Sequence, residues 1–122
     1  MGSGLNMSQP LESTPYWIRI DTTGEITSGD KKPELELLHL MVGGYIEAAP
    51  TELGITAFVD EEGKLKGKPF NPWATVICSD IIAGPMVVTG PADRAGEITH
   101  LPPYYFAMIL FVLAPLGARM VT

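Results

Sequence analysis

Short apolar stretches alternate with glycine- and proline-bearing segments between residues 16 and 90, a pattern typical of short strands and helices joined by turns. Apolar and polar residues alternate over 16–21, which indicates a half-buried strand. Residues 22–24 have the composition of a tight turn, and 25–27 resume the strand pattern. We therefore expect a β-hairpin at the start of the domain.

A helical pattern follows the hairpin over 34–42. The apolar residues that recur there on one helix face are Leu37, Leu38, Met41 and Val42. Gly43 suits the left-handed backbone position that ends many helices. The next apolar stretch, 45–49, predicts a strand that Pro50 ends.

The pattern then predicts a second hairpin, with a strand over 55–59, a turn over 60–63 and a returning strand over 64–66. Beyond it, Asn71 and Pro72 suit the cap and first turn of a helix. We favour a short helix over 73–78, although the β-branched residues there also permit a strand.

A buried strand is predicted over 86–89, and a polar connection over 90–100 leads to an uncharged segment, 103–118. Prolines at both ends limit a helix in this segment to about three turns, and about 20 apolar residues are needed to span a membrane. We therefore expect no membrane role. A helix that is apolar on every side must be covered all round, either by the domain's own sheet or by a second copy of the chain.

These elements predict a small single α+β domain, in which an antiparallel sheet of hairpins packs with two or three short helices. The length of 122 residues suits one core. We interpret 1–6 as an expression scar, 7–14 as a flexible N-terminus and 15–122 as the domain.

Composition narrows the function classes. The net charge is −6 and basic residues form no large cluster, so binding of a nucleic acid polymer is not expected. The single cysteine, Cys78, has no internal disulfide partner, which favours a reducing compartment such as the cytoplasm. Residues 7–14 lack the basic start and the apolar stretch of a signal peptide, so export is not expected.

Catalytic chemistry is not indicated. His39 and His100 are isolated in the sequence, so we expect neither a metal site nor a cofactor. Cys78 lies among apolar residues and suits a buried, inert thiol. The adjacent acids of 60–62 suit a solvated turn, and we therefore expect no enzyme.

Lys64, Lys66 and Lys68 share one face of the chain if the returning strand continues that far. Three ammonium groups on one face would form a local anion site, with Asn71 as a further donor. The aromatic residues that flank this proline-rich loop, Phe70 and Trp73, would stack on a base or contact a partner protein. A charged solvent face, or a sheet edge protected by lysines, remains the alternative.

Two segments of the chain, 40–47 (LMVGGYIE) and 60–71 (DEEGKLKGKPFN), resemble the V-G-G-Y-I-E and E-E-G-K-L-K-G-x-P-x-N segments of a family of small uncharacterised domains common in bacteriophages and mobile elements. A third segment, 80–84 (DIIAG), is similar to the D-I-I-x-G segment of that family. The resemblance covers about residues 16–90 and implies a phage or prophage accessory protein in a bacterial cytoplasm.

From these observations we expect a non-catalytic, homo-oligomeric protein that sequesters a small nucleotide-like anion or a host defence signal. The loop from Lys64 to Trp73 would be its binding site. The alternative is an interaction inhibitor that docks on a host defence protein.

Overall fold

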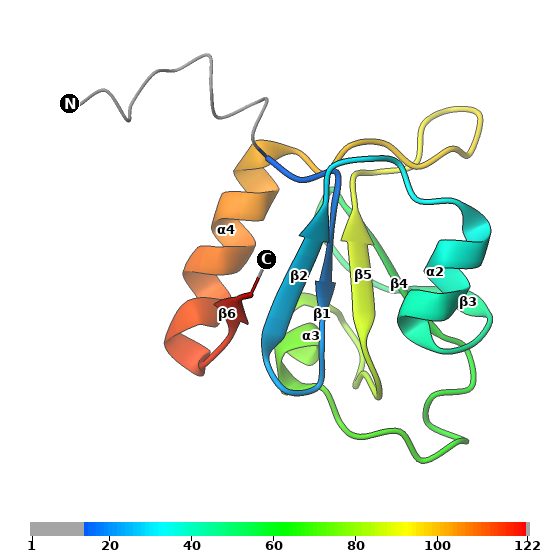
Figure 1. Ribbon diagram of the computed structural model, residues 1–122, viewed down its shortest axis with the longest axis vertical. Helices are drawn as coiled ribbons and strands as arrows, with labels where there is room; N and C mark the ends of the chain where they lie inside the picture. Colours follow the sequence, from blue (N-terminus) through cyan, green and yellow to red (C-terminus); the bar gives the residue numbers. More distant parts are fainter. Residues whose placement is uncertain (1–13, 122) are drawn as a thin grey trace.

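The computed structural model describes residues 14–121 and places six strands in one sheet (Figure 1). The strands are β1 (Trp17–Ile20), β2 (Glu25–Gly29), β3 (Ile46–Ala49), β4 (Thr56–Asp60), β5 (Met86–Thr89) and β6 (Arg119–Met120). Their order across the sheet is β3-β4-β5-β1-β2-β6. Neighbouring strands are antiparallel except for β2 and β6, which are parallel.

The helices in the described part of the chain are α2 (Leu35–Val42), α3 (Pro72–Ile77) and α4 (Pro103–Leu113), and a 3₁₀ turn, η2 (Ala114–Leu116), follows α4. Their ends follow from local sequence. The side chain of Asn71 accepts a hydrogen bond from the Ala74 amide and caps α3, while Gly43 ends α2 with a φ of 80°. The predicted α+β class is confirmed, as is the helical interpretation of 73–78. The predicted expression scar and residues 7–13 of the predicted N-terminus lie outside the described residues.

Helices lie on both faces of the sheet (Figure 1). On one face, α3 and α4 pack on alternate side chains of the central strands, including Ile18, Ile20, Met86 and Val88. On the other face, α2 packs on Phe58 and Val87. The alternation of side chains in β4 and β5 therefore builds two apolar layers, because successive residues of a strand point to opposite faces.

The predicted second hairpin is wrong. β4 pairs with β3 on one side and with β5 on the other, so no edge of β4 is available to a returning strand. The chain instead forms successive turns over 61–67, held by backbone hydrogen bonds such as the 2.8 Å bond from the Lys66 amide to the Glu62 carbonyl. The partners of β4 are the strand that precedes it and a strand well beyond the turn, not the residues that follow the turn directly.

Helix α4 covers the sheet with only one of its sides. Ile109 and Leu113 are buried in the core, whereas Phe111 on the opposite side is 81% exposed. The expectation that the sheet covers this apolar segment is therefore confirmed for its inner side alone. Among the described residues, no helix has the length and apolar character that a membrane span requires.

The two sides of α4 predict different responses to truncation of a side chain. Leu113→Ala should lower the free energy of unfolding by about 2–5 kcal/mol, because it leaves a cavity beneath the helix. Phe111→Ala should change the free energy of unfolding of the monomer by less than about 0.5 kcal/mol, because most of that ring is already exposed to solvent. Urea unfolding monitored by circular dichroism checks both values, and equal losses would contradict the assignment of the inner side.

Candidate functional site

Two of the three predicted site lysines converge on a buried carboxylate. Asp60 ends β4, and its side chain is 1% exposed. The Nζ atoms of Lys66 and Lys68 lie 2.8 and 2.7 Å from its Oδ2 atom. Its Oδ1 atom accepts a hydrogen bond of 2.9 Å from the Glu62 amide. Each carboxylate oxygen therefore has a donor, as a buried charge requires.

The same lysines neutralise the C-terminal end of α2. Lys68 Nζ donates to the carbonyl oxygens of Val42 and Gly43 at 2.7 and 3.1 Å, and Lys66 Nζ donates to that of Gly43 at 3.3 Å. Arg19 Nε donates to the Met41 carbonyl at 2.9 Å. The last carbonyls of a helix lack partners within it and carry partial negative charge, so cations stabilise this end. We call Asp60, Lys66, Lys68 and these carbonyls the Asp60 cluster.

The cluster explains the paired glycines of the sequence. A Cβ atom at Gly44 would lie 2.6 Å from Cγ of Asp60, and one at Gly43 would lie 2.6 Å from Nζ of Lys68. Any side chain at Gly44 would therefore displace the buried carboxylate. The segments 40–47 and 60–71, singled out by resemblance, meet at this point of the fold. The acids of 60–62 are thus not all in a solvated turn: Asp60 is buried, and that prediction is wrong for this residue.

Burial would raise the pKa of the Asp60 carboxyl, but hydrogen bonds from the two lysines and from the Glu62 amide lower this pKa from 3.8 to about 2. The charged form is therefore the one that stabilises the fold. The lysines of the cluster already share a carboxylate and several carbonyls, which reduces the positive charge available to an added anion.

Lys64 lies apart from the cluster and pairs with Asp80, with 3.2 Å between Nζ and Oδ1. This hydrogen bond lowers the pKa of Asp80. Both residues line a groove of about 380 Å³ beside β3, which we call the edge groove. Its lining also includes Glu47 and Glu61, so carboxylates outnumber the lysine there.

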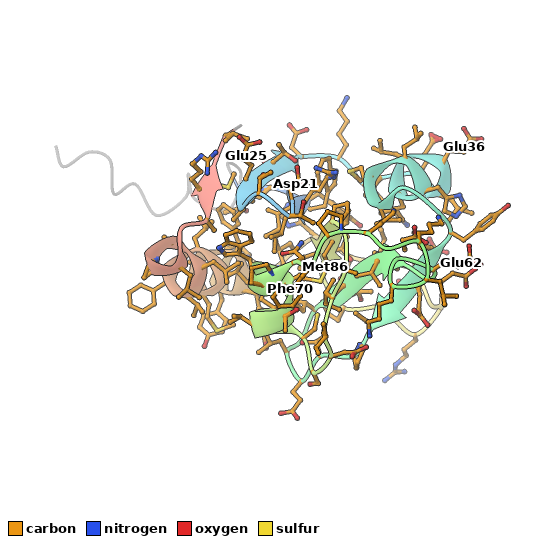
Figure 2. All side chains as sticks on the ribbon, turned by 90° about the horizontal axis from the view of Figure 1, so that it is seen from below. Asp21, Glu25, Glu36, Glu62, Phe70 and Met86 are labelled. Carbon is orange, nitrogen blue, oxygen red and sulfur yellow. The ribbon has the colours of Figure 1, made fainter. Side chains whose placement is uncertain are left out.

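The other predicted site residues support the fold or face solvent. Asn71 is buried, and its Nδ2 atom donates to the carbonyls of Ile20 and Gly84 at 3.0 and 2.9 Å. Trp73 Nε1 donates to the Leu116 carbonyl at 2.9 Å, which ties α3 to η2. Phe70 is 55% exposed and lies near the middle of Figure 2, whereas Glu62 lies at the periphery beside α2. The structure thus brings Lys66 and Lys68 together but gives Asn71 and Trp73 separate structural partners.

Neither a reactive thiol nor a cluster of metal-binding side chains is found within residues 14–121. Cys78 is buried, and this burial raises the pKa of its thiol to about 11, so the thiolate is scarce at neutral pH. Within residues 14–121, no group of three or more His, Cys, Asp or Glu side chains is placed to hold a metal ion.

The chain matches the model of a known family. A family model described as "Domain of unknown function (DUF3846)" matches residues 7–110. The chain belongs to this family. Comparisons with curated proteins and with solved structures found no match. The Asp60 cluster and the edge groove both lie within the DUF3846 match.

The low pKa of Asp60 predicts acid sensitivity of this DUF3846 domain. Because the folded pKa of about 2 lies below the ordinary value of 3.8, the carboxylate contributes stability above about pH 5 and loses it as the pH falls toward 2. The contribution is about 2 kcal/mol. Urea unfolding of the wild type and Asp60→Asn should show a difference in stability that shrinks by this amount between about pH 5 and pH 2. A stability difference that stays constant over this pH range, or an Asp60 carboxyl that titrates near pH 4 by NMR, would contradict the cluster geometry.

The predicted anion site is best tested at Lys64. Charge reversal at Lys66 or Lys68 would break the Asp60 cluster, so loss of binding in those variants would report unfolding. If the loop binds a nucleotide-like anion, Lys64→Glu should lower the affinity for ATP by at least about tenfold and leave the circular dichroism spectrum unchanged. Lys31→Glu, the same change at an exposed lysine outside the loop, serves as the control. Calorimetry that detects no ATP binding by the wild type would contradict the prediction.

Proposed function

We propose that this DUF3846 protein is a non-catalytic binding protein that works as a homo-oligomer, with the outward side of α4 and η2 as the contact between subunits. The observation that carries this proposal is the apolar surface there. Tyr104, Phe111 and Leu116 are 71%, 81% and 53% exposed.

These side chains form one continuous stripe. Tyr104, Met108 and Phe111 recur at the spacing of one helix face. Val112 extends the stripe to a groove that Val76 of α3 also lines. No charged residue occurs from Leu101 to Ala118. Such a stripe in water is typical of a surface that another protein covers.

Charge restricts where a second copy can dock. A typical interface buries about 800 Å² on each partner, more than half of it apolar, so the stripe would form the apolar centre of such an interface. Two copies that each carry a charge of −6 repel one another, so their contact must lie where charge is absent. The stripe meets this condition, and a two-fold axis through it would pair each stripe with its equivalent.

The wider biological role stays a prediction from sequence and resemblance. Origin from a bacteriophage, capture of a nucleotide-like signal and inhibition of a host defence enzyme belong to that prediction. For the last of these, the stripe is also the apolar surface on which an enzyme would dock. Deletion of the chain from Pro102 onward would not test such docking, because it would also remove Ile109 and Leu113 from the core.

A single charge in the stripe should separate the subunits. Phe111→Glu adds a carboxylate at the centre of the proposed contact, where two copies would bury like charges. We expect the wild type to sediment as a dimer at micromolar concentration and the variant as a folded monomer, with dimer affinity reduced by at least about 100-fold. Analytical ultracentrifugation measures both.

Leu40→Glu is the matched control, because Leu40 is 78% exposed on α2, which packs on the other face of the sheet. It should leave the dimer intact. A wild type that stays monomeric at all accessible concentrations, or equal dissociation by both variants, would rule out the α4 contact.

A further inference from the structure

The outer edge of β3 carries backbone hydrogen-bonding groups that face away from the rest of the sheet. β3 is the end strand of the sheet, and β6 lies at the other end. The Tyr45 carbonyl accepts the Glu61 amide at 2.9 Å, so the hydrogen-bonded pairs of the β3–β4 ladder are 45–61, 47–59 and 49–57. The N–H and C=O groups of Ile46 and Ala48 therefore point away from β4. No strand in residues 14–121 pairs with this outer edge.

β3 lacks most of the devices that protect edge strands. Proteins usually block an edge with lysine, proline, a bulge or a covering segment. Between Ile46 and Ala49 there is neither lysine nor proline, and the register with β4 is continuous. The one charge on the strand belongs to Glu47, which is exposed. The edge is therefore accessible to an added strand, and the charge of Glu47 disfavours anionic partners.

The edge groove lies directly beside this strand. Residues 47–50 form one wall, and parts of the segments 59–65 and 80–83 form the others. Two apolar side chains at the groove are highly exposed, Leu65 by 86% and Ile81 by 61%. A peptide added along β3 would place alternate side chains over this groove, because side chains of a strand alternate between its faces.

The charge of the edge groove determines which kind of partner can bind there. The groove is lined by the carboxylates of Glu47, Glu61 and Asp80, and its Lys64 is paired with Asp80. A second copy paired edge to edge would bring two Glu47 side chains close together, and an anionic ligand would meet the same carboxylates. A cationic segment meets opposite charge instead.

We propose that β3 and the edge groove bind an extended, cationic peptide segment of a partner protein, which adds to the sheet as a strand. The backbone groups of Ile46 and Ala48 hold its main chain. Leu65 and Ile81 receive its apolar side chains, and the groove carboxylates select lysine or arginine. This site is separate from the proposed α4 contact.

The test uses the full chain and a capped, fluorescein-labelled octapeptide of alternating valine and lysine. Fluorescence anisotropy should show saturable binding by the wild type. Ala48→Pro removes an N–H group that the β4 ladder does not use, and proline is tolerated at such edge positions. This variant should bind at least about tenfold more weakly, whereas Ala48→Ser should bind as the wild type does.

Two further measurements separate the proposal from non-specific attraction and from misfolding. Glu47→Lys should weaken binding of the valine–lysine peptide and strengthen binding of a valine–glutamate peptide. A valine–lysine peptide with every backbone nitrogen methylated should not bind the wild type, which tests main-chain pairing even if Ala48→Pro fails to fold. Binding that survives this methylation, unchanged binding by folded Ala48→Pro, or no binding of the unmodified peptide would each overturn the proposal.

Discussion

The structure depends on the burial of one carboxylate, that of Asp60, between two lysines and the C-terminal end of a helix. An unpaired charge in this position would cost several kcal/mol, so the fold requires its partners to be in place. The carboxylate ends β4, the carbonyls end α2, and the lysines belong to the turns that follow β4. One ion cluster therefore fixes the position of α2 relative to β4 and to the turns that directly follow β4.

The cluster also determines which surfaces of the protein remain open. Because Lys66 and Lys68 must reach back to Asp60, the chain after β4 folds into turns instead of continuing as a strand. That course places Lys64 and Leu65 at the rim of the edge groove beside β3, the end strand of the sheet.

Local signals made most elements predictable. Gly43 ends α2, Asn71 and Pro72 begin α3, and the first hairpin follows from simple alternation of apolar and polar residues. Each of these depends on neighbours in the sequence, so no knowledge of the tertiary fold is needed.

The Asp60 cluster was not predictable in the same way. Nothing in the sequence Asp60-Glu61-Glu62 marks the first acid as buried, because its burial depends on how the turns after β4 return Lys66 and Lys68 to it. The spacing of Lys64, Lys66 and Lys68 is compatible with one face of a strand. It is equally compatible with turns that bring Lys66 and Lys68 back to the Asp60 carboxylate. The short β6 carries no alternation of its own, and its parallel pairing with β2 depends on the course of η2. The paired glycines at 43 and 44 were the available signal, since such pairs mark close approach of other atoms.

The two proposed contact surfaces have opposite chemistry, which keeps their partners distinct. The α4 stripe carries no charge, so it tolerates a second acidic copy but offers a cationic peptide no ionic partner. The β3 edge carries carboxylates, so it attracts such a peptide and repels the second copy. The two surfaces also lie on opposite sides of the molecule in Figure 1. A dimer joined through α4 would therefore keep both β3 edges accessible, and two linked edges would bind a partner with two cationic segments more tightly than one edge alone.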